Sequence, residues 1–332
     1  MQNNKVKISV IVPTHNRADA LQKTLNNLLF QDFEGRWEVV VVNNNSTDDT
    51  NEVVRSVQAE FPVPLHLFHE KIPGPAAARN CGVKKSAGEF IVFIDNDILV
   101  EPDFVRQRVK IIEENPGCWF VGKVVNPKEL RETPFGRYRD DLHQNSFRNF
   151  PSDCFTETSA ATGQDWAMRK KEFIKIGGFD EDFSIASCED AELALRARQN
   201  GIRNLFNPKN VVVHNDWAVD LDSFCKRQYL YSISSVLLWQ KYGAESGIQI
   251  QLFKENSPID RNNDSATLIG KKIIKRILAN SFGKSVLRAG CNVLERIVPD
   301  SKSSYKAYTI TVSLFIFSGV REGFRRYTTD NQ

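Results

Sequence analysis

Two carboxylates separated by one residue follow an apolar run in EFIVFIDNDILVEPDF, residues 89–104. The run Phe90–Ile94 is typical of a buried strand, and it leads directly into Asp95 and Asp97. Two such charges within about 6 Å repel by roughly 1–3 kcal/mol at an effective dielectric constant of about 20 to 80. A chain tolerates this repulsion when a loop solvates the carboxylates or when a hard divalent cation lies between them. The pair is therefore a candidate metal site, with two loop-capping carboxylates as the alternative.

Three further polar segments follow expected strands or open expected helices. PTHNRADAL (13–21) and NNNSTDDT (43–50) lead from strands into helices, so we expect their side chains and backbone N–H groups in one crevice. Ser, Thr and Asp in the second segment are also common helix caps. GPAAARNCGV (74–83) places small residues in the first turns of a helix, where a ligand can come close. Its Arg79 suits phosphate oxygens, or else it is a solvated residue on a surface helix.

A second acidic pair, Glu189-Asp190, lies at the start of an expected helix in SCEDAELALRARQNGI, residues 187–202. Ser187 and Asp190 have the spacing of a capping box, which is a structural role. A helix N-terminus also fixes a carboxylate in place, as a general base requires. The two roles are compatible at this position.

The N-terminal half alternates short β-branched runs with helical patterns. The strand candidates are the apolar runs at 8–12, 39–42, 65–68 and 90–94. The helix candidates are the patterns at 21–29, at 53–57 and from Pro102 onward. This alternation predicts a mostly parallel sheet with helices on both faces, in which ligands bind beyond the carboxyl ends of the strands. The candidate metal site follows such an end.

The composition is that of a soluble globular protein, with 41% hydrophobic and 26% charged residues in a chain of 332. The six cysteines include no CxxC pair, which argues against a zinc knuckle or a disulfide framework and favours reduced thiols in the cytoplasm. No GxGxxG follows the first strand and no GxxxxGK[ST] occurs, so dinucleotide and P-loop interpretations lose their main support. The start, MQNNKVKISVIVP, holds an apolar run that is too short for a signal-peptide core.

Six segments, taken together and in order, resemble family 2 glycosyltransferases of the GT-A fold. They are ISVIVPTHNR, VVVVNNNSTDDT, GPAAARNCGV, FIDNDI, GQDWAMRKKEFIKIGGFDEDF and CEDAELALRARQNG. The similarity covers residues 6–216. It implies a Rossmann-like nucleotide-binding α/β domain, a nucleoside-diphosphate sugar as donor, a divalent cation and inversion at the anomeric carbon.

The resemblance also implies roles for individual residues. Asp95-Asn96-Asp97 resembles the DxD motif of the family, with Asp97 on the metal and Asp95 on metal or ribose. In many relatives a histidine at the position of His214 is a further metal ligand, and an oxygen–nitrogen shell suits manganese somewhat better than magnesium. Glu189-Asp190 resembles the ED motif, with Asp190 as general base for the acceptor hydroxyl and Glu189 as its support or an acceptor contact.

Residues of the same segments are expected to contact the donor. They are Pro13, Thr14, His15, Arg17, Asn43, Asn45, Ser46, Gly74, Arg79, Asp95, Asn96, Gln164, Asp165 and Trp166. Gln164 and Asp165 replace the small residue and Asn that are common in the family, and Trp166 could stack on a sugar face. Asn43 replaces an Asp that usually accepts a hydrogen bond from the uracil ring. An uncharged amide oxygen accepts at about half the strength, so a UDP-sugar is favoured, but less strongly.

The last part of the chain differs from the rest in charge. Residues 271–332 carry twelve Lys/Arg and four Asp/Glu, whereas residues 1–270 carry 32 and 37. We therefore predict a catalytic domain at 1–217 and a basic, mainly helical region at 218–332. The uncharged stretch 307–320 is shorter than the approximately 20 residues of a membrane span.

The basic region suggests a place for the protein in the cell. Residues 271–327 are expected to lie on an anionic membrane surface, at the inner face of the cytoplasmic membrane. A helical lid and a dimer contact are the alternatives, and no nucleic acid is expected as a partner.

The predicted function is metal-dependent, inverting transfer of a sugar from a nucleoside-diphosphate sugar to an acceptor hydroxyl. The acceptor belongs to a bacterial-type polysaccharide, glycolipid or lipid-linked glycan. One alternative is a sugar-nucleotide-forming nucleotidyltransferase, which usually has a Gly-rich, basic loop that PTHNR lacks. The other is a non-catalytic, membrane-associated nucleotide-sugar-binding protein, against which the intact Glu189-Asp190 pair argues.

Overall fold

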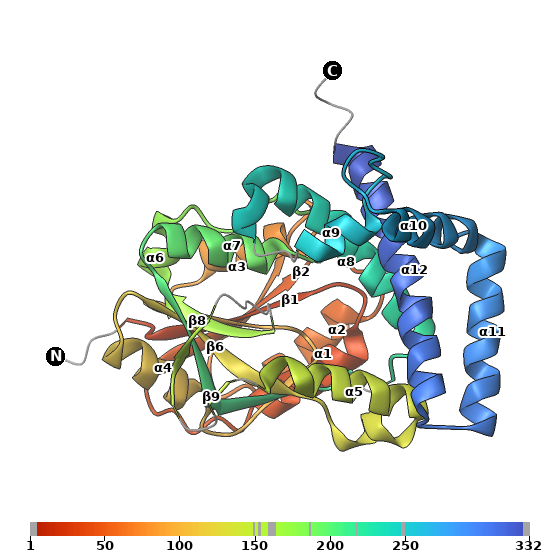
Figure 1. Cartoon of the computed structure of the whole chain (residues 1–332). Helices are drawn as coiled ribbons and strands as arrows, with labels where there is room; N and C mark the ends of the chain where they lie inside the picture. Colours follow the sequence, from red (N-terminus) through yellow and green to blue (C-terminus); the bar gives the residue numbers. More distant parts are fainter. Residues whose placement is uncertain are drawn as a thin grey trace. The chain divides into compact units, whose positions relative to one another are not determined.

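The structure is a computed structural model that describes residues 5–148, 150–151, 154–158, 164–185, 187–216, 218–246 and 250–327. The chain divides into two compact units (Figure 1). Unit 1 comprises Met1–Pro127 and Phe147–Asp216, and unit 2 comprises Lys128–Ser146 and Trp217–Gln332. The predicted domain boundary follows residue 217, and that residue lies outside the described residues. In the structure, segment 128–146 groups with the C-terminal helices, which was not predicted from the sequence.

The described residues of unit 1 form one nine-stranded sheet in the order β3-β2-β1-β4-β8-β6-β9-β5, with β7 paired to β9. The strands are β1 Ile8–Thr14, β2 Trp37–Asn43, β3 Leu65–His69, β4 Phe90–Ile94, β5 Ile98–Val100, β6 Cys118–Val125, β7 Thr156–Glu157, β8 Asp165–Arg169 and β9 Arg203–His214. Strands β3, β2, β1 and β4 are parallel, and β8 is antiparallel to β4 and β6. The four predicted strands are β1 to β4, and the predicted α/β class is confirmed.

Helices cover both faces of this sheet. They are α1 Ala18–Leu28, α2 Thr50–Gln58, α3 Pro75–Lys85, α4 Phe104–Glu114, α6 Lys170–Lys175 and α7 Glu189–Gln199. Successive strand residues point to opposite faces, so Val39 and Val41 pack with α1, α2 and α4. Val40 and Val42 pack with α3, α6 and α7. Burial on both faces is the reason that these strands are apolar throughout.

Several strand ends meet at one edge of the sheet. Strands β1 and β2 end in register at Thr14 and Asn43. Strand β5 is antiparallel to β9, with Ile98 opposite His214. The backbone N–H of residue 215 donates to the carbonyl of Asp97 at 2.7 Å. Segments that are more than a hundred residues apart in the sequence are therefore joined at this edge.

Unit 2 is helical. It contains the 3₁₀ helices η1 Lys128–Glu132 and η2 Gly243–Ser246 and the α-helices α5 Pro134–Phe147, α8 Leu221–Tyr242, α9 Ile250–Asn256, α10 Ala266–Leu278, α11 Ser281–Ile297 and α12 Lys302–Tyr327. Helices α8, α10 and α11 start after Asp220, Ser265 and Asn280, whose side chains accept a hydrogen bond from a first-turn N–H. None of the helices within the described ranges combines the length and the apolar composition that crossing a bilayer requires.

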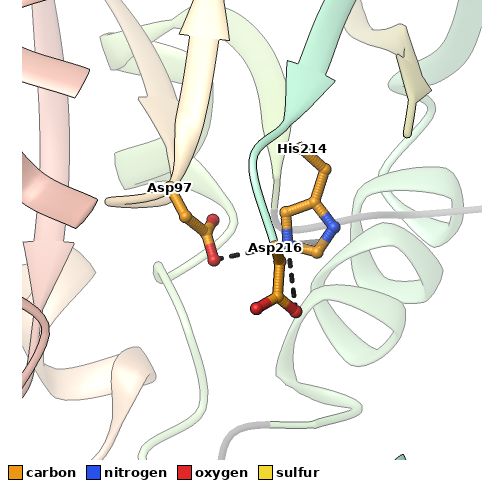
Figure 2. A group of neighbouring side chains, drawn as sticks. All are labelled: Asp97, His214 and Asp216. Carbon is orange, nitrogen blue, oxygen red and sulfur yellow. Dashed lines mark ion pairs between the residues drawn. The ribbon is translucent and has the colours of Figure 1, made fainter. Parts of the chain in front are cut away.

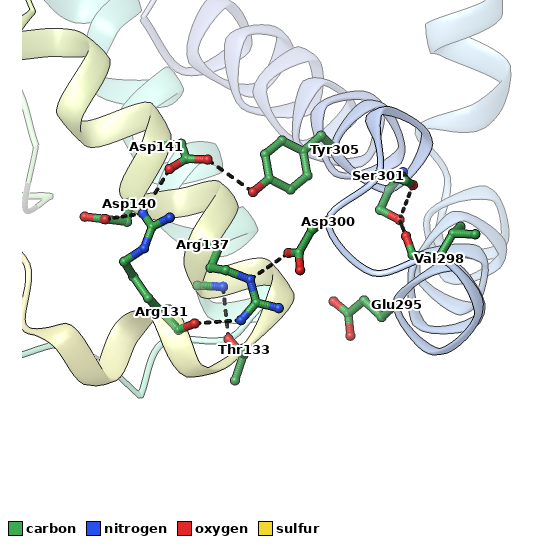
Figure 3. A network of polar contacts seen from close by, with 12 residues as sticks. Arg131, Thr133, Arg137, Asp140, Asp141, Glu295, Val298, Asp300, Ser301 and Tyr305 are labelled. Carbon is green, nitrogen blue, oxygen red and sulfur yellow. Dashed lines mark hydrogen bonds and ion pairs between the residues drawn. The ribbon is translucent and has the colours of Figure 1, made fainter.

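A polar network fixes α5 to α12 and to the turn before it (Figure 3). Arg137 Nε donates to Asp300 Oδ1 at 2.7 Å, and the Tyr305 hydroxyl donates to Asp141 Oδ2 at 3.1 Å. The ring of Tyr138 packs edge-on against that of Tyr305, with centroids 5.3 Å apart. These contacts explain why segment 128–146 belongs to unit 2.

Candidate active site

A cavity of about 900 Å³ lies beyond the carboxyl ends of β1, β2 and β4 in unit 1. The predicted site residues that line it are Pro13, Thr14, His15, Arg17, Asn45, Gly74, Arg79, Asp95, Asn96, Asp97, Gln164, Glu189 and Asp190. The predicted metal-binding acid and the predicted base therefore face one cavity, as reaction between bound donor and acceptor requires. Asn44, Lys71 and Ser184, which sequence reasoning did not select, line the cavity as well.

Asn43 and Ser46 shape the loop after β2 and lie outside the cavity lining. The side-chain oxygen of Asn43 accepts from the Ser46 N–H, and its amide donates to Asn51 Oδ1, both at 2.8 Å. Ser46 Oγ accepts from the backbone N–H of Asn16 at 3.0 Å. In this structure the polar side-chain atoms of both residues make hydrogen bonds within the loop, and their expected contacts with the donor stay a prediction.

Asn44, the next residue, ties this loop to the start of α3. Its amide donates to the carbonyls of Glu70 and Ile72, and its oxygen accepts from the Gly74 N–H at 2.8 Å. Gly74 has φ +122°, and an added Cβ would lie 2.8 Å from the carbonyl oxygen of Ser184. Glycine is required here, and it starts an eleven-residue helix whose N-terminal end borders the cavity. Helix N-termini favour anions such as phosphate.

Asp97, His214 and Asp216 form a group of candidate metal ligands (Figure 2). One ligand atom from each lies within 4.8 Å of the others. His214 Nε2 is 3.3 Å from Asp97 Oδ2 and 4.0 Å from Asp216 Oδ2. Asp97 Oδ1 is buried and has no hydrogen-bond partner among the described residues. Two carboxylates, an imidazole and an orphaned buried oxygen fit a divalent cation.

Asp216 was missed by sequence reasoning, although it lies two residues after the selected His214. The signal that could have identified it is the His-x-Asp spacing at the end of β9. The Asp216 N–H donates to the His214 carbonyl at 2.8 Å, and this tight turn brings the second carboxylate back toward the imidazole.

Arg17 supplies positive charge to the same group. Its Nη1 donates to Asp97 Oδ2 at 2.8 Å, and its Nη2 donates to Asp216 Oδ1 at 3.1 Å. Burial opposes ionisation of Asp97, but the hydrogen bond from His214 and the charge of Arg17 outweigh burial, so the pKa of Asp97 lies below its ordinary value. Asp97 is therefore a carboxylate at neutral pH, as a metal ligand must be.

Arg79 joins the two acidic pairs. Its side chain is 4% exposed, and it donates to Glu189 Oε1 at 2.7 Å and to Asp95 Oδ1 at 2.9 Å. Burial raises the pKa of Asp95 by more than the charge of Arg79 lowers it. Each terminal nitrogen of Arg79 thus holds one carboxylate in place. Asp95 is not part of the group of candidate metal ligands formed by Asp97, His214 and Asp216.

The first turn of α7 presents Glu189 and Asp190 to the cavity. Glu189 is buried, and its Oε2 has no hydrogen-bond partner within the described part of the chain. Asp190 is half-buried, and its Oδ1 accepts from the N–H of Ala191 at 2.7 Å. The helix starts after Cys188, which has a left-handed φ of +68° and caps without a side-chain hydrogen bond, so the predicted capping box from Ser187 is wrong.

Asp165 and Trp166 are core residues of β8, and their predicted contacts with the donor are wrong. Trp166 is fully buried against Phe93 and Trp119, so it has no ring face to offer a sugar. Asp165 is also fully buried and accepts from Arg108 Nε at 3.2 Å. Strand β8 lies between β4 and β6 in the sheet. Trp166 packs in the cluster with α3, α6 and α7, and Asp165 on the other face pairs with Arg108 of α4, so both side chains are covered by helices.

The fold of this chain is that of GT-A glycosyltransferases. A mannosyltransferase from Pyrobaculum calidifontis, solved in complex with GDP-Man and Mn²⁺, has a TM-score of 0.64 and 21% identity. That similarity covers 99% of this chain and 89% of the other. The crystal structure of residues 1–349 of TarS from S. aureus matches this chain with a TM-score of 0.52 and 18% identity. The match covers 98% of this chain and 93% of the TarS chain.

The chain belongs to Glycosyl transferase family 2, whose family model matches residues 9–177, half of the chain. A validoxylamine A glucosyltransferase of Streptomyces hygroscopicus subsp. jinggangensis is 27% identical over 262 residues, which is 70% of this chain and 58% of the relative. An uncharacterized glycosyltransferase of Rickettsia bellii is 33% identical over 141 residues, or 42% of this chain. The chain spans 19% of the length of that Rickettsia protein. These findings confirm the family and the fold expected from the motifs.

Proposed function

We propose that this protein transfers a sugar, with inversion, from a nucleoside-diphosphate sugar to an acceptor hydroxyl, and that it needs a divalent cation. The observation that carries the proposal is that Asp97 and Asp190 line the same cavity of about 900 Å³. Asp97, which lines this cavity, is grouped with His214 and Asp216 as candidate metal ligands. Family membership and the GDP-Man complex of the Pyrobaculum structure support the class of donor.

In the proposed reaction Asp190 accepts the proton of the acceptor hydroxyl, whose oxygen attacks the anomeric carbon as the bond to the nucleoside diphosphate breaks. Attack in line with the leaving group inverts the configuration. Arg79 positions Glu189 beside the base, and the N-terminal end of α3 favours the diphosphate. A cation held by Asp97, His214 and Asp216, manganese or magnesium, would neutralise negative charge on the leaving group. Asp95 serves as a further ligand or a ribose contact.

We also propose a specific class of donor and of acceptor. We take a UDP-sugar as the first donor to test, which agrees with the UDP-GlcNAc complex solved for TarS. The acceptor belongs to a bacterial-type polysaccharide, glycolipid or lipid-linked glycan. Residues 271–327 make a peripheral contact with the inner face of the cytoplasmic membrane.

Substitution of the base tests this proposal. Asp190→Asn should slow donor turnover by about 10²–10⁴-fold, because it removes a general base but keeps the size of the side chain. Turnover is measured as Mn²⁺-dependent release of UDP from UDP-sugars, with water or added glycans as acceptor. Binding of UDP should stay within about threefold of the original protein.

The matched control is Asp182→Asn, an exposed carboxylate of the same unit, which should leave turnover unchanged. Unchanged turnover by Asp190→Asn would refute the assignment of the base. Pyrophosphate release from a nucleoside triphosphate and a sugar phosphate would instead identify a nucleotidyltransferase.

A further inference from the structure

Unit 2 contains a second cavity, of about 990 Å³, bordered by α8, α10, α11 and α12. The charged residues that line it are Lys226, Arg276, Lys284, Arg321, Arg325 and Glu322. Glu322 forms an ion pair with Arg325 at 2.8 Å. In the part of the chain that the structure describes, the other four cations have no carboxylate within ion-pair distance. The cavity thus has excess positive charge, which favours an anionic ligand.

Burial destabilises the positive charge of one of these residues, Lys284. Burial lowers the pKa of Lys284, and its Nζ lies 4.5 Å from the centre of the Phe315 ring. An ammonium group in such a place is stabilised when an anion binds beside it. The chemistry of the cavity, four cations without carboxylate partners next to aromatic rings, suits a phosphate group on an amphiphilic molecule.

An apolar ridge is exposed on α10 and α11, two of the four helices that border the cavity. We define the ridge by the residues Ile273, Ile274, Ile277, Phe282, Val286, Val293 and Ile297. Phe282 and Ile297 are 78% and 70% exposed. On α11 the ridge residues recur at helical spacing along one face, while Cys291 on the other face is buried against Thr311 of α12.

We propose that the basic cavity and the apolar ridge form one lipid-binding site, which holds the phosphate headgroup of an anionic phospholipid while the ridge enters the membrane surface. The two features share α10 and α11, since Arg276 of the cavity is adjacent to Ile277 of the ridge. On α11 the cavity residue Lys284 lies on the face opposite the ridge, because residues two apart in an α-helix are about 200° apart. An amphipathic helix with basic residues beside an apolar face is the usual form of such a contact. The inference rests on the peripheral contact proposed above and adds a headgroup site to it.

Charge decides between a membrane and a second copy of the chain as the occupant of the ridge. Residues 266–297, which span α10 and α11, carry seven Lys/Arg and one Glu. Two copies that met through this face would bring like charges together, whereas an anionic bilayer attracts each basic residue near its surface. The ridge is therefore assigned to an anionic lipid surface.

Vesicle sedimentation of the full chain tests the site without any donor sugar, so its outcome is independent of transferase activity. The chain should sediment with vesicles of mixed phosphatidylcholine and phosphatidylglycerol, but not with phosphatidylcholine alone. Each basic residue near an anionic surface contributes about fivefold to the partition coefficient. Arg276→Ala combined with Arg321→Ala should therefore weaken binding by about 25-fold, and the two Arg→Lys substitutions should preserve it.

Variants of the ridge and of unit 1 complete the design. Ile277→Ser combined with Phe282→Ser should weaken vesicle binding at least tenfold, because both side chains leave the apolar layer. The controls are Phe30→Ser, at a residue that is 71% exposed in unit 1, and Arg55→Ala, an exposed cation of the same unit, and both should bind as the original chain does.

Four results would overturn the proposal. The chain could fail to sediment with phosphatidylglycerol vesicles, or the double Arg→Ala variant could bind as well as the controls. Stabilisation by inorganic phosphate without vesicle binding would assign the cavity to a soluble anion. A lipid-free dimer, seen by sedimentation velocity and abolished by the ridge substitutions, would assign the ridge to a second copy.

Discussion

Replacement of Arg79 by Met is expected to destabilise unit 1 far more than loss of a surface ion pair would. The Arg79 side chain is 4% exposed and donates to Glu189, which is 6% exposed, and to Asp95, which is 29% exposed. Loss of one partner from a buried ion pair usually costs about 3–5 kcal/mol, because the remaining charge stays uncompensated. We expect about 3–4 kcal/mol at neutral pH, since solvent partly screens Asp95.

The destabilisation should depend on pH in a definite direction. The pKa of Asp95 is already raised by burial, so the folded chain holds this proton more tightly than the unfolded chain does. Stability therefore falls as the pH rises above the ordinary value for Asp, about 3.9. Removal of Arg79 raises this pKa further. The difference in unfolding free energy between the original protein and Arg79→Met should be small near about pH 4 and largest at neutral pH.

Urea unfolding followed by circular dichroism at several pH values measures this difference. Arg108→Met is the matched control, because Arg108 forms another buried pair in unit 1, with Asp165; the two side chains are 2% and 0% exposed and do not line the cavity. It should lose similar stability, but only Arg79→Met should also impair donor turnover under conditions where both fold. Arg106→Met, in an exposed pair, should change stability far less than Arg79→Met does. A loss below about 1 kcal/mol for Arg79→Met, or a loss independent of pH, would refute the reasoning.

Three further substitutions test other parts of the structure. Asp216→Asn should weaken Mn²⁺ binding at least about tenfold in calorimetry, because it removes one of three grouped ligands; equal affinity would place the metal elsewhere. Gly74→Ala should cost about 1–3 kcal/mol and lower the melting temperature, because of its φ of +122° and the close carbonyl of Ser184; an unchanged Tm would contradict this. Tyr308→Phe should cost about 1.5–3 kcal/mol in urea unfolding, because the buried hydroxyl donates to Glu295 at 2.6 Å; a neutral result would show that this bond is dispensable.

Strands β1, β2 and β4 of unit 1 could be predicted because each is buried on both faces and is therefore largely apolar in sequence. Strand β8 could not, since its five residues begin with the charged Asp165, whose burial depends on Arg108 of α4. Segment 128–146 could not be assigned either. Its partners, such as Asp300 and Tyr305, come more than 150 residues later, and a local pattern does not report contacts at that distance.

Sequence motifs indicate the types of the site residues and their order along the chain. The candidate site could be predicted to that extent, but the contacts of each side chain could not. Asp97, Glu189, Asp190 and the other lining residues come from segments whose relation to the strand ends is regular in this fold. The run Asn43-Asn44-Asn45 shows the limit. Three identical side chains in a row do not reveal which of them reach the cavity. The structure places Asn44 and Asn45 there and uses Asn43 inside the loop.

Because β5 pairs with β9, the candidate cation site forms late in folding. Asp97 and His214 become neighbours only when the chain between them has formed its strands and helices, so a newly made chain has no complete ligand group until residue 216 has been synthesised. Contacts of such long sequence separation form slowly compared with local ones. Uptake of a luminescent lanthanide during refolding would therefore report completion of the whole sheet, and truncated chains that end before β9 should not acquire it.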